Sequence, residues 1–465
     1  MSDSSSGSVP PHSVPPLSIP PLSIPPLSIP PQWVIEKKRD KEVLSEEEIR
    51  GFIAGYTDGS IPDYQMAALA MAIYLNGMTF EETAFLTDAM MRSGELLDTS
   101  SLTRPKADKH STGGIGDKVS LVLGPIAAAC GLDVPMISGR GLGITGGTLD
   151  KFEAIPGYRT DLSEAEMIKV IQACGCSIVG QTRSLAPADK KLYGLRDVTA
   201  TVPSIPLITA SIMCKKLAEG IDSLVLDVKW GRGAFMKELD QARDLASNMV
   251  QVGRSMDKKV SAVITRMDQP LGRSAGNAVE VQESIDCLKG NGPEDLMEVT
   301  LALTAEMLVL SEVADSPEAA LAQCQAAIDS GAALEKFRHM VELHGGNPAV
   351  IDDPTVMTAA QSIEPFAARN AGYVTDVDAE AIGRGVLVLG AGRTRAEDGV
   401  DHAVGVSQLV KAGEFVEAGQ PLCLVHANPA SQLEEAHDWF GKAFSLSDEA
   451  PESNASLSLI TETLR

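Results

Sequence analysis

The stretch VPMISGRGLGITGGTLDK (residues 134–151) places a short apolar run before a loop that has five glycines between Ser138 and Thr148. Other short apolar or β-rich runs, VSLVLG, SLVLDV and VSAVIT, alternate beyond Arg104 with helical stretches such as EAEMIKVIQACG and FMKELDQARDLASNMVQVG. Alternation of strands and helices is typical of a sheet covered by helices. In open sheets of this class, ligands bind where loops follow the carboxyl ends of strands. The stretch therefore predicts an α/β domain with a ligand site at one edge of its sheet.

Two further segments have a helical pattern. From Trp33 to about Met91, apolar residues recur at spacings of three and four, and Ser45 with the glutamates after it predicts a capping box. The second segment, PADKKLYGLRDVTATV followed by PLITASIMCKKLAEG, interrupts the α/β part of the chain. We expect both segments to form one small helical domain that is discontinuous in the sequence.

The chain beyond about Gly372 has a β-rich pattern, with VLVLGAG and the hairpin-like KAGEFVEAGQPLCLV. The prediction is therefore an α/β multidomain protein, in which a small, discontinuous all-helical domain accompanies a large α/β domain with a mixed sheet and a C-terminal β-rich subdomain. The expected boundaries are 1–32 for a disordered Pro-rich extension built on repeated PPLSI, 33–104 and 187–220 for the helical domain, 105–186 and 221–371 for the α/β domain, and 372–465 for the β-rich subdomain.

The net charge of the chain excludes some classes of binding partner. With 39 basic and 63 acidic residues, the formal charge is -24, which repels nucleic acid and anionic membranes. No apolar run is long enough for a membrane helix, and the seven scattered cysteines lack the spacing of a metal site. We expect reduced thiols, a cytoplasmic location, no metal and no contact with nucleic acid or membrane.

Against this acidic background, KHSTGGIGDK (residues 109–118, the first strip) is rich in donors. Glycines let backbone N–H groups approach an anion, and Lys109, Ser111 and the nearby Ser120 add side-chain donors. Phosphate fits this set best, although glycine-rich segments are also common as plain tight turns. Residues 138–151 (the second strip) carry a similar loop, which could alternatively be a crossover that packs helix on sheet.

A third group consists of Tyr193, Arg196, Ser211 and Lys215, and the last two are four residues apart on one expected helix face. Arg196 and Lys215 could donate to the carbonyls of a planar heterocycle whose N–H is accepted by Ser211. The alternative is a solvated helix face. His110, inside the first strip, could supply a proton to a departing group, or could merely order the loop.

Four motifs in this order resemble the thymidine and pyrimidine-nucleoside phosphorylase family: KHSTGGIGDK, SGRGLGITGGTLDK, PADKKLYGLRDVTATV and PLITASIMCKKLAEG. The similarity extends from about Val43 to the C-terminus. The resemblance implies reversible phosphorolysis of a pyrimidine nucleoside, most readily thymidine, without a cofactor. It implies that residues 105–186 contribute the phosphate site and residues 187–220 the base site, that domain rotation closes the cleft, and that a homodimer forms through the helical domain. The implied phosphate contacts are Lys109, Ser111, Ser120, Ser138 and Thr148; the implied base contacts are His110, Tyr193, Arg196, Ser211 and Lys215, of which His110, Arg196 and Lys215 are catalytic.

The chain departs from the family pattern at one position, and a second bears on specificity. Ile144 stands where most relatives have a histidine. Lys118 stands where relatives of broad specificity have a threonine and sometimes a bound potassium ion; a lysine there resembles the thymidine-type enzymes and argues against a cation. Preference for the 2′-deoxy sugar stays open at this point. So do two alternatives: a phosphoribosyltransferase of the anthranilate type, and a non-catalytic binder with the same fold.

Overall fold

The computed structural model describes residues 27–141, 143–395, 397–451 and 458–465. Most of the predicted Pro-rich extension, residues 1–26, lies outside the described residues. The first helix, α1 (Pro31–Arg39), begins two residues before the expected start of the helical domain at residue 33, and the preceding Leu27 and Ile29 already pack against the apolar core.

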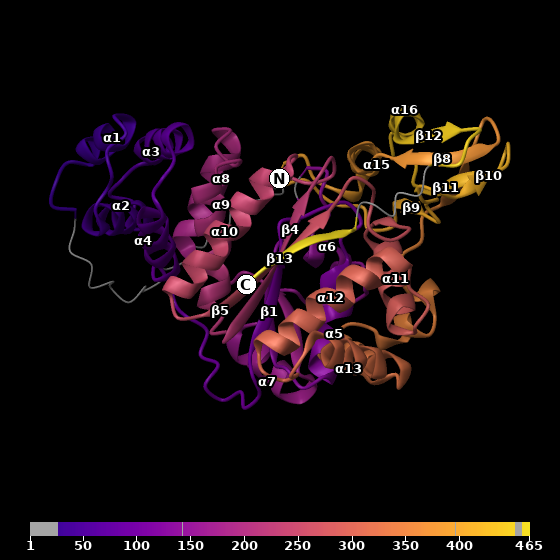
Figure 1. Cartoon of the computed structure of the whole chain (residues 1–465), viewed down its shortest axis with the longest axis horizontal. Helices are drawn as coiled ribbons and strands as arrows, with labels where there is room; N and C mark the ends of the chain where they lie inside the picture. The colour runs from indigo at the N-terminus through magenta and orange to yellow at the C-terminus, as the bar shows by residue number, and fades with distance from the viewer. Residues whose placement is uncertain (1–26, 142, 396, 452–457) are drawn as a thin grey trace, which may run out of the picture.

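The helical domain is assembled from two separate segments, as predicted (Figure 1). Ser45 forms the predicted capping box at the start of α2 (Glu46–Asp58), and Thr79 forms a second one at the start of α4 (Phe80–Met91). Helix α9 (Ile205–Ala218) packs along α4. Helix α8 (Pro187–Val198) contacts α2, α3 (Asp63–Asn76) and α4.

The α/β domain contains a mixed sheet with the order β1-β4-β5-β13. Strands β1 (Ala107–Ser111), β4 (Ser223–Trp230) and β5 (Lys259–Arg266) are parallel, whereas β13 (Ile460–Leu464) is antiparallel to β5. A parallel pair, β2 (Val134–Ser138) and β3 (Cys176–Gly180), is linked to β1 by a bridge between Lys106 and Asp133. The chain therefore returns from the β-rich part to the central sheet at its very end.

Helices surround this sheet, and one of them was expected as a strand. VSLVLG begins α5 (Val119–Ala129), in which every residue from Val119 to Ala128 is buried. A helix that is buried on all sides has no amphipathic period, so its sequence resembles that of a buried strand. The other helices are α6 (Thr148–Glu153), α7 (Glu164–Cys174), α10 (Leu239–Ser255), α11 (Ala278–Leu288), α12 (Glu294–Leu310), α13 (Pro317–Asp329), α14 (Ala332–Leu343) and the short η1 (Pro348–Ile351) and η2 (Pro354–Val356).

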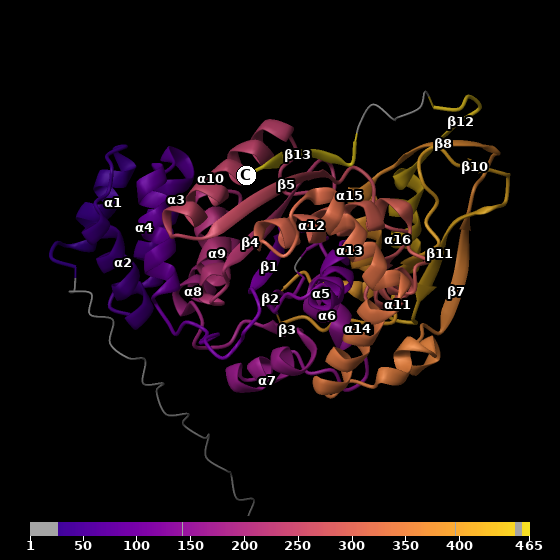
Figure 2. The same ribbon diagram turned by 60° about the horizontal axis from the view of Figure 1, so that its bottom comes forward.

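The C-terminal domain lies at the opposite end of the molecule from α1–α4 (Figures 1 and 2). It contains two antiparallel sheets, β6-β9-β11-β7 and β10-β8-β12, to which the α/β segment 275–276 contributes β6. Its elements are β6 (Ala275–Gly276), β7 (Ser362–Ala367), β8 (Gly372–Val377), α15 (Ala379–Val386), the π-helical turn η3 (Leu387–Ala391), β9 (Gly405–Ser407), β10 (Phe415–Val416), β11 (Pro421–Ala427), α16 (Leu433–Ala443) and β12 (Phe444–Ser447).

Two details of this domain differ from expectation. VLVLGAG is not a strand but the end of α15 and the turn η3, where Gly390 has a φ of 106°. KAGEFVEAGQPLCLV is not a hairpin, because β10 pairs with β8 whereas β11 pairs with β7 and β9. Local alternation identified β10 and β11 as strands but could not identify their partners.

Candidate active site

The first strip begins on β1, whose alternating side chains place Lys109 and Ser111 on one face and His110 on the other. Lys109 is buried, and its Nζ lies 3.8 Å from Asp227 Oδ2 and 4.0 Å from Asp117 Oδ1. Lys229, also buried, lies 2.8 Å from the same oxygen of Asp227. Two ammonium groups therefore face two carboxylates beneath the strip.

The carboxylate of Asp117 binds the hydroxyl group of Ser111, which is one of the predicted phosphate contacts. Burial alone would raise the pKa of Asp117, but the ammonium groups of Lys109 and Lys229 hold that pKa well below its ordinary value. Ser111 Oγ donates to Asp117 Oδ2 at 2.6 Å and accepts from Gly113 N at 3.1 Å. Sequence analysis missed Asp117, Asp227 and Lys229, although a lysine and an aspartate inside the apolar run SLVLDVKW were a visible anomaly.

The second strip lies against the first. Ser138 ends β2, Thr148 is the first residue of α6, and Ser120 is the second residue of α5. Lys151 Nζ donates to the backbone oxygen of Asp117 at 2.9 Å and so connects the strips. Of the five predicted phosphate contacts, Lys109, Ser111 and Ser138 thus lie on β1 and β2, and Ser120 and Thr148 lie in the first turns of the helices that follow these strands.

Lys118 is fully buried in a cage of oxygen atoms. Its Nζ donates to the backbone oxygens of Leu271 and Ser274, at 3.0 and 3.1 Å, and to Glu283 Oε2 at 2.5 Å. Burial lowers the pKa of Lys118, but Glu283 and Glu280 more than offset this and raise it. A charged ammonium therefore lies where these oxygens could otherwise surround a monovalent cation.

The third group lies on α8 and α9. Arg196 is 1% exposed, and its guanidinium donates to the backbone oxygens of Val202 and Leu207, at 2.6 and 3.0 Å, with a longer contact of 3.4 Å to that of Thr201. Burial lowers the pKa of Arg196 to about 10, so the group is charged at neutral pH. Some of the N–H groups of Arg196 thus bind the backbone between α8 and α9 and the start of α9. The sequence did not reveal this structural role. Tyr193, one turn earlier, is 40% exposed.

Lys215 and Ser211 share one face of α9, as predicted. Lys215 Nζ donates to Ser211 Oγ at 3.1 Å, to the Ser211 backbone oxygen at 2.5 Å and to Asp189 Oδ2 at 2.5 Å. Asp189 is buried in the first turn of α8. Sequence analysis missed this residue, although its spacing of four and seven from Tyr193 and Arg196 places all three on one helix face.

Helix α9 is fixed to β1 by a buried cluster beneath His110. Lys216 Nζ donates to Asp108 Oδ2 at 2.5 Å, to the Ile137 backbone oxygen at 2.7 Å and to Glu219 Oε1 at 2.8 Å. Burial lowers the pKa of His110 well below its ordinary value, and the charges of Lys216, Lys215 and Lys109 lower it further. His110 is therefore neutral at pH 7. It lies on β1, on the face opposite to Lys109 and Ser111, which is the face from which Asp108 pairs with Lys216 of α9.

All seven cysteines are free thiols. Within the described ranges, no cluster of three or more His, Cys, Asp or Glu side chains could hold a metal ion, and no helix has both the length and the apolar character needed to cross a membrane.

Three domain families match successive parts of the chain. Residues 32–94 match the helical bundle domain of the glycosyl transferase family, residues 103–334 match its a/b domain, and residues 373–447 match the pyrimidine nucleoside phosphorylase C-terminal domain. Pyrimidine-nucleoside phosphorylases from Staphylococcus aureus strains bovine RF122 / ET3-1 and USA300 are each 50% identical over 395 residues, which cover 85% of this chain and 91% of theirs.

Among solved structures, anthranilate phosphoribosyltransferase from Thermus thermophilus is similar with a TM-score of 0.56 and 18% identity, over 67% of this chain and 98% of that one. At this identity the likeness concerns the fold alone. The sequence relatives are far more specific, and with the matching domains they assign the chain: it belongs to the thymidine and pyrimidine-nucleoside phosphorylase family, whose members are pentosyltransferases.

Proposed function

We propose that this protein catalyses the reversible phosphorolysis of pyrimidine nucleosides, and that thymidine is its preferred substrate. The products would be thymine and 2-deoxyribose 1-phosphate. The observation that carries the proposal is the buried bridge between Lys216 and Asp108, which fixes the helix of Ser211 and Lys215 against the strand of Lys109. The names of the relatives that share half of their residues with this chain support the same reaction.

The phosphate would bind between the two strips. Hydroxyl groups and one buried ammonium from β1, β2 and the helices that follow them would supply side-chain donors, and glycines would expose backbone N–H groups. Asp117 and Asp227 are the counter-charges of Lys109 and Lys229 while phosphate is absent. The proposed side-chain donors are Lys109, Ser111, Ser120, Ser138 and Thr148.

The pyrimidine would lie across from the phosphate, against α8 and α9. Arg196 and Lys215 are charged and can stabilise the negative charge that develops on the departing base. Ser211 can accept the ring N–H, and Tyr193 can contact the ring. Because His110 is neutral, its role would be to donate one N–H to the base carbonyl nearest the glycosidic bond, rather than to act as an imidazolium.

In the forward reaction, an oxygen of hydrogen phosphate forms a bond to C1′ while the bond between C1′ and the ring nitrogen breaks. The electron pair of that bond moves to the base, and the proton that the phosphate gives up ends on the base. The sugar becomes cation-like on the way, so catalysis depends on holding the two reactants together and on stabilising the leaving anion. Closure of the helical domain on the α/β domain would complete this arrangement and exclude water.

Three further expectations belong to this proposal. The enzyme would need no cofactor or metal, because Lys118 supplies the cation in the cage of Leu271, Ser274 and Glu283. It would be cytoplasmic. It would form a homodimer through the helical domain, a proposal supported by an exposed apolar row on one face of α3, formed by Tyr64, Met71 and Leu75.

The two alternatives have less support. A phosphoribosyltransferase of the anthranilate type is favoured only by a likeness of fold at 18% identity. A non-catalytic binder would have no need of the two cations, Arg196 and Lys215, that we assign to the leaving base.

The test is to incubate the purified protein with thymidine, and separately with uridine, in the presence and absence of phosphate. The proposal expects base release that depends on phosphate and is faster from thymidine. Release that does not depend on phosphate would refute the reaction, and equal rates from both nucleosides would refute the preference.

A further inference from the structure

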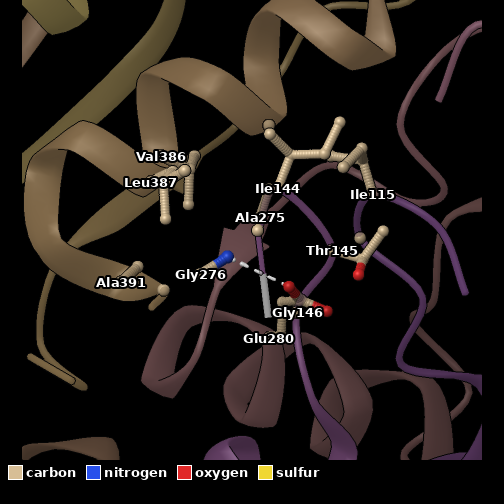
Figure 3. A pocket seen from close by; sticks show the side chains of 14 residues that line it. Ile115, Ile144, Thr145, Gly146, Ala275, Gly276, Glu280, Val386, Leu387 and Ala391 are labelled. Atoms are coloured by element: carbon tan, nitrogen blue, oxygen red, sulfur yellow. Dashed lines mark hydrogen bonds between the residues drawn. The ribbon is translucent and has the colours of Figure 1, made fainter. Parts of the chain in front are cut away.

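The apolar core of the C-terminal domain reaches into both glycine-rich strips. Ile115 of the first strip is buried in the same hydrophobic cluster as Val386 and Leu389, and Ile144 of the second strip packs against that cluster. Both isoleucines line a pocket together with Val386 and Leu387 (Figure 3). Each predicted phosphate loop therefore has one apolar side chain anchored outside its own domain. The presence of an isoleucine at position 144 is explained by this apolar surrounding.

Helix α15 approaches the two strips so closely that it needs a glycine at the contact. A Cβ atom on Gly383 would lie 2.5 Å from Ile115 Cδ1 and 3.2 Å from the backbone oxygen of Ile144. A larger residue at this position would force the Ile115 side chain to shift and would press on the backbone of Ile144.

A buried polar contact ties the second strip to the same domain. Arg393 Nη1 donates to Asp150 Oδ1 at 2.7 Å, and the Arg393 backbone oxygen accepts from Gly143 N at 2.8 Å. Asp150 Oδ2 in turn accepts from Gly141 N at 2.7 Å. The side chains of Arg393 and Asp150 are only 9% and 3% exposed, so this ion pair is shielded from solvent. Asp150 is two residues beyond Thr148 on α6, so the pair fixes both the loop and the helix start that follows it.

We propose that Arg393 is a positioning residue for phosphate, acting through Asp150, Gly141 and Gly143, and that the C-terminal domain is a necessary part of the phosphate site. This inference rests on the proposed function. A loop with five glycines has many accessible conformations, and ordering it only when the ligand arrives weakens binding. The contacts of Arg393 and of Gly383 fix the loop in advance. Four of the five predicted base contacts lie on α8 and α9 and the fifth, His110, lies on β1, whereas the contacts of Arg393 and Gly383 reach the two glycine-rich loops. We therefore expect the C-terminal domain to affect the binding of phosphate.

The first test compares Arg393→Gln with Arg395→Gln, an exposed arginine two residues away. Steady-state rates are measured with phosphate and thymidine varied independently. We expect Arg393→Gln to raise KM for phosphate about tenfold, the size of one lost charge-assisted hydrogen bond, with KM for thymidine changed less than twofold. Arg393→Lys should recover part of the loss. Hydrogen exchange should accelerate at the amides of Gly141 and Gly143, and the control variant should match the wild type in every measurement.

The second test avoids leaving Asp150 buried without its partner. Gly383→Ala adds one methyl group at the contact with Ile115 and Ile144, and Gly441→Ala adds the same group to α16, where no atom lies within 4 Å. We expect Gly383→Ala to raise KM for phosphate and to accelerate the same two amides, and Gly441→Ala to do neither.

Two outcomes overturn the inference: unchanged KM for phosphate and unchanged exchange in both Arg393→Gln and Gly383→Ala, or a parallel loss of kcat, of both KM values and of thermal stability, which would indicate a merely structural role. A wild-type enzyme that releases no base in the presence of phosphate would instead refute the proposed function. In that case, hydrogen exchange at the amides of Gly141 and Gly143, compared between wild type and Arg393→Gln, would still show whether Arg393 holds the second strip.

Discussion

The ammonium of Lys215 lies 2.5 Å from the buried carboxylate of Asp189, on the neighbouring helix of the same domain. The proximity of Asp189 also supports the charged state of Arg196, since its negative charge raises the pKa that burial lowers. One carboxylate thus serves as the counter-charge for both cations that we assign to the leaving base.

Asp189→Asn should therefore weaken nucleoside use. The amide keeps the shape of the side chain but lacks the charge that holds Lys215 in place, and Lys215 and Arg196 then lose their shared counter-charge. We expect KM for thymidine to rise about tenfold and KM for phosphate to change less than twofold. Asp197→Asn, at an exposed position of the same helix, is the matched control. An Asp189→Asn enzyme with normal KM for thymidine would show that Lys215 does not depend on this pair.

His110→Ala should reduce kcat/KM about 100-fold, because a positioned donor to the leaving base is lost. The pH dependence gives a second readout. The pKa of His110 lies well below 6.5, so its protonation can reduce activity only in acid solution, and the His110→Ala profile should lack that part of the wild-type decline. His339→Ala, an exposed histidine on α14, is the control. Near-normal turnover of His110→Ala would limit the residue to ordering the loop.

The sequence predicted the three-part architecture because most elements have a clear period: VPMIS, SLVLDV and VSAVIT are β-rich runs between helical segments, and α2 begins with a capping box. Prediction failed at VSLVLG and VLVLGAG. Both are rich in residues that favour strands, and the first is buried on every side, so neither has a period that distinguishes helix from strand.

The donors of the candidate site were predictable for a different reason, since lysines and hydroxyls beside glycines are conspicuous in an acidic chain. Their counter-charges were not. Lys118 pairs with Glu283, which is 165 residues away, and Lys216 pairs with Asp108, which is 108 residues away. Nothing local distinguishes such a carboxylate from the other acidic residues of the chain. Only the fold brings each pair together.

Lys118→Thr should convert a potassium-independent enzyme into one that needs the ion. The substitution leaves Glu283 and the backbone oxygens of Leu271 and Ser274 without a cation, although Glu283 keeps the hydrogen bonds from Ser274 Oγ and Arg273 N. Removing one partner of an ion pair that is largely shielded from solvent is destabilising. Potassium can occupy a site of carbonyl and carboxylate oxygens. We therefore expect a lower Tm and lower activity in sodium buffer, both recovered by added potassium.

Lys118→Met is the matched control, because its side chain fills the cage without a charge and leaves no room for the ion. It should lose stability without recovery. A wild-type enzyme whose activity itself changes when sodium is replaced by potassium would contradict the assignment of Lys118 as the resident cation.

A last prediction concerns stability and lies away from the active site. His344 is fully buried, its Nδ1 donates to the Arg159 backbone oxygen at 2.8 Å, and its Nε2 accepts from Ser177 Oγ at 2.9 Å. Burial lowers the pKa of His344 to about 4. In the unfolded chain the pKa returns to about 6.5, so between these values the unfolded state binds more protons than the folded state.

The contribution of His344 to stability is therefore complete above pH 6.5 and is lost as the pH falls from there toward 4. Between pH 7 and pH 5 we expect a loss of about 2 kcal/mol in the free energy of unfolding from this residue. Urea unfolding of wild type and His344→Gln at both pH values measures it. Burial also lowers the pKa of His402 and His426, but they titrate in both proteins, so the difference between the two pH dependences isolates His344. Equal pH dependence in wild type and variant would mean that the pKa of His344 is the same in the folded and the unfolded chain, and would contradict the prediction.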